Sequence, residues 1–134
     1  MDRKNLLKRL ATLILFIFLV NYIAMKFYWY SAIWYFDMPM HFIGGFWLGL
    51  AFLWIFHVEE FSFRFLFRIT IFILLIGIFY EVFELLVDKS ITHKPFNALD
   101  TLSDIFFALA GGLSAVFYFF KKIMPINENT IQLK

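Results

Sequence analysis

The chain alternates between long apolar blocks and short polar segments. The apolar blocks cover approximately residues 10–30, 38–57, 65–87 and 101–120, each about 20 residues long, which is the length that an α-helix needs to cross a bilayer. Lipid offers no hydrogen-bond partner to a free backbone group, so all four blocks are expected to be helical. The pattern predicts an all-α, polytopic membrane protein with four transmembrane helices in a bundle.

The composition supports this interpretation. Of 134 residues, 63% are hydrophobic and only 16% are charged, which argues against both a soluble globular domain and a disordered chain. The absence of cysteine excludes disulfides, thiolate metal ligands and cysteine nucleophiles. The net charge of +2 comes from scattered lysines and arginines, which disfavours nucleic acid as a partner. Without repeats or linkers, residues 1–134 are interpreted as a single transmembrane domain.

The positive charges predict an orientation. The first apolar block is too long for a signal-peptide core and lacks a cleavage site, so it is interpreted as a retained span. With the N-terminus in the cytoplasm, nine basic residues lie inside and three lie outside, as the positive-inside rule requires. Both termini are therefore expected to be cytoplasmic. The inner residues are Arg3, Lys4, Lys8, Arg9, Arg64, Arg68, Lys121, Lys122 and Lys134, and the outer ones are Lys26, Lys89 and Lys94.

Ionisable residues near three of the helix ends form pairs. The spacings of three and four residues place the members of each pair on one face of a helix. Under the predicted topology, all three helix ends lie on the outer side of the membrane, so the pairs reach a similar depth. The pairs are Asp37–His41, Glu81–Glu84 and Asp100–Asp104.

Small residues continue the same helix faces. Gly45 and Gly49 follow His41 at intervals of four, and Ala108 and Gly111 follow Asp104. Small residues let transmembrane helices approach closely, so the pairs are expected to face the interior of the bundle.

Each pair also has a purely structural interpretation. Asp37 could be the N-cap of the second helix, and Asp100, or Thr101 with Asp104, could cap the fourth. His41 could be a hydrogen-bonded structural residue. Glu81 is the hardest to explain in this way, because it lies within a span, where a charge costs at least about 2.5–3.5 kcal/mol.

Five crowded carboxylates cannot all remain ionised without protonation, a basic partner or a bound cation. A divalent cation, Mg²⁺ or Mn²⁺ before other metals, suits carboxylate oxygens with one imidazole. We assign Asp37, His41, Glu81 and Asp104 as candidate metal ligands. Candidate catalytic bases are Glu84 and Asp100, and candidate substrate-binding residues in the outer loop are His93 and Lys94.

Three motifs resemble a known family. In order, they are Asp37-x-x-x-His41-Phe42-x-x-Gly45-Phe46, Tyr80-Glu81-x-x-Glu84, and Asp100-Thr101-x-x-Asp104 followed by Ala108-x-x-Gly111. Together they resemble the YjdF-like bacterial membrane proteins, which are similar to the VanZ-like proteins. The VanZ-like pattern usually has Gln and Arg near its second motif, where this chain has Glu84 and no matching Arg. The resemblance implies a multi-pass protein of the bacterial cytoplasmic membrane and a shared site, without naming a reaction.

Three functions fit these observations. The first is a metal-dependent enzyme that acts on a lipid headgroup or a lipid-linked phosphate, with a membrane lipid as its substrate. The second is a proton- or cation-coupled small transporter, for which four spans would have to form a homo-oligomer. Carriers usually bind near the midplane, whereas these acids gather near one face. The third is a non-catalytic membrane protein with a structural metal site.

Overall fold

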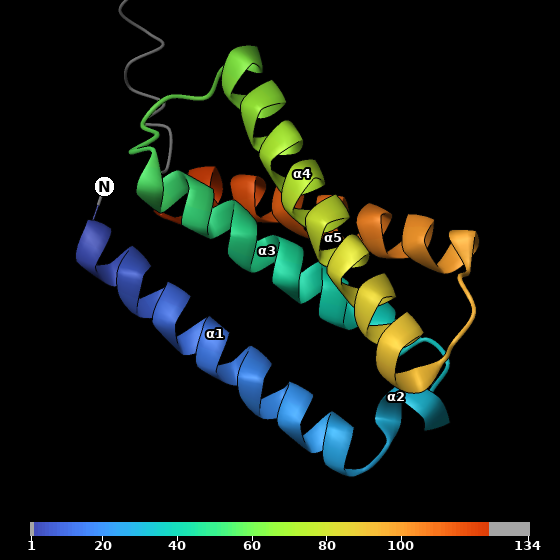
Figure 1. Cartoon of the computed structure of the whole chain (residues 1–134). Helices are drawn as coiled ribbons and strands as arrows, with labels where there is room; N and C mark the ends of the chain where they lie inside the picture. The colour runs from blue at the N-terminus through green and yellow to red at the C-terminus, as the bar shows by residue number, and fades with distance from the viewer. Residues whose placement is uncertain (1, 124–134) are drawn as a thin grey trace, which may run out of the picture.

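The computed structural model describes residues 2–123, and within this part of the chain every regular element is a helix. Lys134, counted above among the inner charges, lies outside the described residues. The long helices are α1 (Arg3–Lys26), α3 (Asp37–Ile55), α4 (Phe63–Val87) and α5 (Ala98–Tyr118). Short elements are α2 (Trp29–Ala32), η1 (Asp88–Thr92) and η2 (Phe119–Ile123), and η1 and η2 are π-helical turns that extend α4 and α5 (Figure 1). Four helices are long and apolar enough to cross a membrane, which confirms the predicted fold class.

The first long helix lies closer to the N-terminus than the approximate span expected from the sequence. Residues 10–30 were expected to be helical, but α1 runs from Arg3 to Lys26. It begins early because the Asp2 carboxylate accepts a hydrogen bond from the Asn5 backbone N–H and caps the helix. It ends early because Tyr28 adopts a left-handed conformation, with φ of 56°, that turns the chain.

The other boundaries differ from prediction by a few residues. The span expected over 65–87 begins at Phe63, because the Ser62 hydroxyl caps α4 by accepting a hydrogen bond from the Phe65 N–H. The span expected over 38–57 is Asp37–Ile55, and that over 101–120 begins at Ala98.

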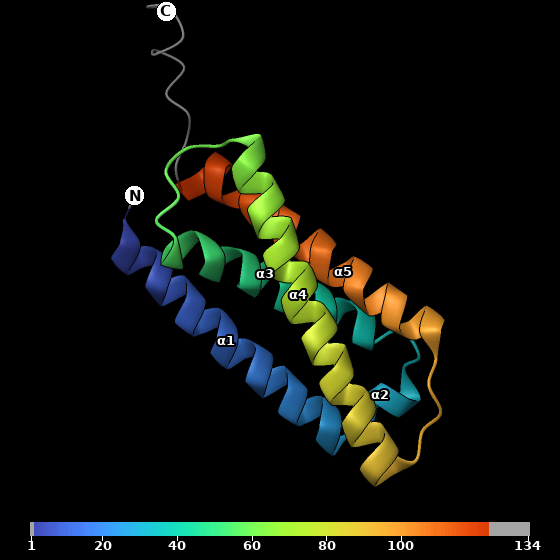
Figure 2. The ribbon, with the colours of Figure 1, turned by 45° about the horizontal axis from the view of Figure 1, so that its top comes forward.

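Helices α3 and α5 form the closest pair in the bundle. A Cβ atom added at Gly45 would lie 1.9 Å from the Ala108 carbonyl oxygen, and one added at Gly111 would lie 1.9 Å from the Phe42 carbonyl oxygen. The two backbones therefore touch, as the small residues predicted. Helix α1 packs against α3, and α4 crosses over α3 and α5 (Figures 1 and 2).

The two ends of the bundle differ in chemistry. The start of α1, the start of α4 and η2 lie together at one end, which we call the basic end, and Arg9 donates a hydrogen bond there to the Tyr118 hydroxyl. The starts of α3 and α5 and the end of α4 meet at the opposite, acidic end (Figure 2). The fully buried apolar core is closer to the basic end. Its largest side chains are Leu6, Leu50, Leu53, Ile69, Ile73 and Phe119.

Candidate functional site

His41 is the centre of the acidic end. Its Nε2 atom lies 3.4 Å from Asp37 Oδ1, one turn earlier on α3, and 3.7 Å from Asp104 Oδ2 on α5. The close backbone contact between α3 and α5 brings these side chains together, since Gly45 follows His41 by one turn and meets Ala108, one turn after Asp104.

Helix α4 adds two more carboxylates around the same imidazole. Oxygens of Glu81 and Glu84 and a ring nitrogen of His41 all lie within 4.8 Å of one another. One ligand atom from each of Asp37, His41 and Asp104 also lies within 4.8 Å of the other two. The structure thus brings five of the six paired residues into one carboxylate–histidine cluster, formed by Asp37, His41, Glu81, Glu84 and Asp104.

Two members of the cluster are buried, and the hydrogen bonding of the cluster is incomplete. Asp104 is 3% exposed and Glu81 is 6% exposed. Among the described residues, three buried oxygens have no hydrogen-bond partner: Glu81 Oε1, Glu84 Oε2 and Asp104 Oδ1. A buried polar atom without a partner costs about 1–3 kcal/mol, and more if it is charged. Protons or a bound cation would offset this cost.

The capping interpretations of the acids are wrong. Helix α3 begins at Asp37 itself, with Phe36 in the N-cap position. The N-cap of α5 is Asn97, whose side-chain oxygen accepts a hydrogen bond from the Leu99 N–H, so Asp100 lies inside the first turn. In the sequence, Asn97, whose short polar side chain lies three residues before Asp100, was the better candidate for the N-cap of this helix.

The remaining predicted site residues lie at the rim. Asp100 and Lys94 are exposed, and both line a small cavity of about 20 Å³ that Glu81, Glu84 and Asp104 also line. His93 is exposed, has a left-handed φ of 54°, and ends η1. It is not among the residues that line this cavity.

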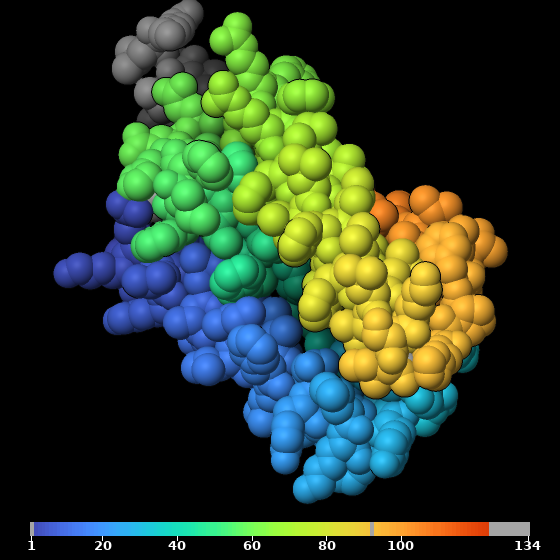
Figure 3. All heavy atoms as spheres, viewed as in Figure 1, coloured from blue at the N-terminus to red at the C-terminus, as the bar shows by residue number. Residues whose placement is uncertain are grey.

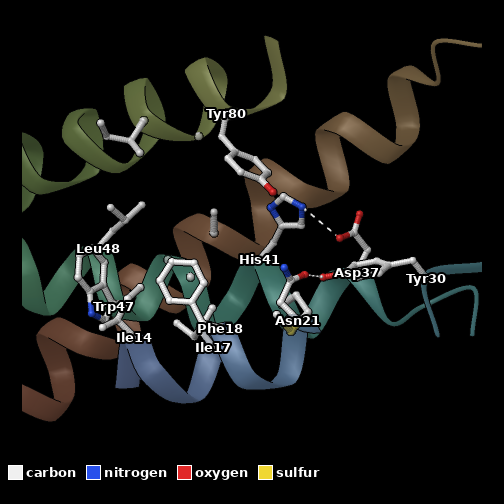
Figure 4. A pocket seen from close by; sticks show the side chains of 16 residues that line it. Ile14, Ile17, Phe18, Asn21, Tyr30, Asp37, His41, Trp47, Leu48 and Tyr80 are labelled. Carbon is white, nitrogen blue, oxygen red and sulfur yellow. Dashed lines mark hydrogen bonds and ion pairs between the residues drawn. The ribbon is translucent and has the colours of Figure 1, made fainter. Parts of the chain in front are cut away.

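Three polar residues near the cluster were not predicted as site residues. The Tyr80 ring packs edge-on against the His41 ring, with centroids 5.7 Å apart. The Tyr30 hydroxyl donates a hydrogen bond of 2.7 Å to Asn21 Oδ1 (Figure 4). Partial burial and the negative charge of Asp37 raise the pKa of Tyr30 to about 12. Only the position of Tyr80 beside Glu81 could have indicated any of them from the sequence.

These residues belong to a second, larger cavity of about 360 Å³ beside the cluster. His41, Asp37 and Tyr80 lie at one end of it, and aliphatic and aromatic side chains from α1, α3 and α4 line the rest (Figure 4). The cluster is thus accessible from a mainly apolar compartment.

The donor set fits a hard divalent cation. Carboxylate oxygens with one imidazole suit Mg²⁺ or Mn²⁺, and the three unpartnered oxygens are available as ligands. Fold and cluster together define a polytopic helical membrane protein with a buried carboxylate–histidine site.

Comparison with known proteins identifies the family. The family DUF2238, described as a predicted membrane protein, matches residues 1–123, and the chain belongs to it. No curated protein and no solved structure matched the chain.

Proposed function

We propose that this protein is a metal-dependent membrane enzyme that acts on a lipid headgroup or a lipid-linked phosphate. The observation that carries the proposal is the carboxylate–histidine cluster, in which buried oxygens of Glu81, Glu84 and Asp104 lack a partner among residues 2–123. Such a cluster inside a membrane bundle is costly unless it binds something, and a functional role is the usual reason for its presence.

The cluster residues divide into binding and proton-transfer roles. Asp37, His41, Glu81 and Asp104 would hold the cation, which would supply charge neutralisation for phosphate oxygens. Glu84 is favoured over Asp100 as the base, because it lies inside the cluster whereas Asp100 is exposed at the rim.

The proposed reaction is a substitution at phosphorus. Glu84 would take the proton of an attacking water or acceptor hydroxyl as its oxygen bonds to phosphorus and the bond to the leaving group breaks. Glu84 would then return this proton to the leaving-group oxygen through water, which regenerates its carboxylate. Lys94 extends from the rim and could contact a phosphate oxygen, and His93 in the same loop is the second candidate for this contact.

The charge pattern and the motifs support a location for the proposed reaction. The positive-inside rule favours the acidic end at the outer face of the membrane, with both termini in the cytoplasm. The resemblance to bacterial families supports the bacterial cytoplasmic membrane. The three motifs carrying Asp37, Glu81 and Asp104 support a relationship to the YjdF-like and VanZ-like proteins.

Glu81→Gln tests the proposal with little change in shape. The protein in nanodiscs is titrated with Mn²⁺, and binding is followed by electron paramagnetic resonance. Headgroup release from bacterial lipid extract is followed by mass spectrometry. We expect the parent to bind Mn²⁺ and to release headgroup, and Glu81→Gln to lose both, because it loses a buried anionic ligand. Glu59→Gln, the same change at an exposed residue, is the control and should match the parent.

Other results would reject the enzyme. Full turnover by Glu81→Gln would show that the cluster does not take part in catalysis. A cation flux in liposomes that Glu81→Gln abolishes, without headgroup release by the parent, would favour transport. Mn²⁺-dependent thermal stability without turnover or flux would indicate a structural metal site.

A further inference from the structure

The large cavity opens sideways between two helices. Its 16 lining residues come from α1, α3, α4 and α5 and from the short helix α2, which carries Tyr30. Figure 3 shows the side chains of α3 at the bottom of a groove between α1 and α4. In a protein whose four long helices cross a membrane, an open groove along the helices faces the hydrocarbon of the bilayer.

The lining changes from polar to apolar along the groove. Asn21, Tyr30, Asp37 and His41 gather at one end (Figure 4). The opposite end is apolar and carries Ile14, Trp47 and Leu48. This gradient matches a molecule with a polar group at one end and a hydrocarbon chain behind it.

Two glycines keep the groove open. Gly44 and Gly77 both line it, and a Cβ atom added at either would meet nothing within 4 Å among the described residues. They differ from neighbouring Gly45, whose missing side chain is required by the contact with Ala108. Glycine inside a helix generally costs about 0.5–1 kcal/mol relative to alanine. Helix packing therefore does not explain Gly44 and Gly77, whereas an occupant of the groove would.

We propose that this groove binds one hydrocarbon chain of a membrane lipid and places the lipid's polar head at the carboxylate–histidine cluster. This inference rests on the proposed function and specifies its substrate as a lipid presented from within the bilayer. The volume of about 360 Å³ is near the lower end of ligand pockets, which span about 300–1,000 Å³, and suits one chain better than a whole lipid.

Trp47 provides a direct probe of the groove. Its indole N–H donates a hydrogen bond of 2.9 Å to the Leu10 carbonyl oxygen, which fixes the ring at the groove wall. In a background with Trp29, Trp34 and Trp54 changed to Phe, Trp47 is the remaining tryptophan. We expect its fluorescence in detergent to be quenched saturably by phosphatidylglycerol brominated in the middle of its acyl chains.

The matched variants fill or spare the groove. Gly44→Leu with Gly77→Leu puts two side chains into the groove, and their Cβ atoms meet nothing within 4 Å among the described residues. We therefore expect the protein to fold and the saturable quenching to be lost. Thr12→Leu, exposed on the opposite side of α1, is the control and should be quenched like the parent. Helical circular dichroism and elution volume check folding, and Gly77→Leu alone serves if the double variant does not fold.

The results separate this inference from the proposed function. If a folded, groove-filled variant shows unchanged saturable quenching, the proposal that the groove binds a lipid chain is overturned, whether or not Mn²⁺ binds. Quenching in the parent that does not saturate, or no quenching, also overturns it. Quenching that filling abolishes, in a protein that neither binds Mn²⁺ nor releases headgroup, supports the groove and rejects the enzyme.

Discussion

Tyr30 and Asn21 illustrate how single residues shape the polar end of the groove. The Tyr30 hydroxyl donates to Asn21 Oδ1, nine residues earlier, because the chain turns back after α1. The phenol lies near Asp37, so ionising it would place a second negative charge beside a carboxylate. Partial burial, and then this repulsion, raise its pKa from an ordinary 10.0 to about 12.

Tyr30 predicts a pH dependence of stability. A folded-state pKa above the unfolded value means that the folded protein retains this proton more strongly. The stabilisation is therefore complete below about pH 10 and is lost as the pH rises to about 12. Thermal unfolding in detergent should show a midpoint that falls over this range. In Tyr30→Phe the fall should be smaller, and below pH 10 the variant should be less stable by about 1 kcal/mol because one hydrogen bond is lost.

Tyr22→Phe is the control, since Tyr22 is exposed on α1. Identical pH profiles for Tyr30→Phe and the parent would show that the phenol does not sense the acidic end.

At the level of the element, the α3–α5 contact positions the cluster. The backbones touch through Gly45 and Gly111, so the turn before Gly45 holds His41 against Asp104. Displacing one helix by the width of a methyl group would separate these side chains. Packing and site chemistry are thus coupled through the same two helices.

The adjacent glycines Gly44 and Gly45 test this coupling. Gly45→Ala puts a methyl group 1.9 Å from the Ala108 carbonyl oxygen, and overpacking of this kind costs about 1–3 kcal/mol. We expect a lower unfolding midpoint in detergent and weaker Mn²⁺ binding. Gly44→Ala meets nothing within 4 Å in the described part of the chain, so its midpoint should stay the same or rise. Equal midpoints for the two variants would contradict the close contact.

Features that depend on residue spacing within one helix could be predicted from the sequence, and the groove, which depends on how the helices pack, could not. Spacing along one helix placed Glu81 with Glu84 and Gly45 with Gly49, because the helix repeat is known in advance. The start of α1 was predicted late because the Asp2 cap lies in a charged segment that apolar patterning ignores. The groove could not be predicted, because the spacing that put Gly45 on the packed face gave no sign that Gly44, one residue earlier, lines an open groove.

On the scale of the whole molecule, the bundle is divided along its length. Apolar core packing is concentrated toward the basic end, and the acidic end is held by Asp104, His41 and Glu81. Large apolar side chains such as Phe67 and Phe79 are exposed on the outside, as lipid contact requires. A cation at the acidic end would therefore stabilise the half with less apolar packing.

The orientation of this divided molecule in the membrane gives the last prediction. Among the described residues, eight lysines and arginines lie toward the basic end, and only Lys26, Lys89 and Lys94 lie toward the acidic end. The positive-inside rule then predicts that the acidic end lies outside the cytoplasm. The chain has no cysteine, so single cysteines can report this without background. Ser31→Cys, next to the acidic end, should react with a membrane-impermeant maleimide in intact cells.

Glu60→Cys, in the exposed connection at the basic end, is the matched position and should react only after the cells are lysed. The reverse labelling pattern would show that the cluster faces the cytoplasm. In that case the groove would still open to the bilayer, because its sideways opening between α1 and α4 does not depend on orientation. The substrate would then be a lipid of the inner leaflet, while the roles of His41 and the surrounding carboxylates would stay the same. Under the proposed function, orientation therefore decides which leaflet would supply the lipid, and the cluster would act on its headgroup in either case.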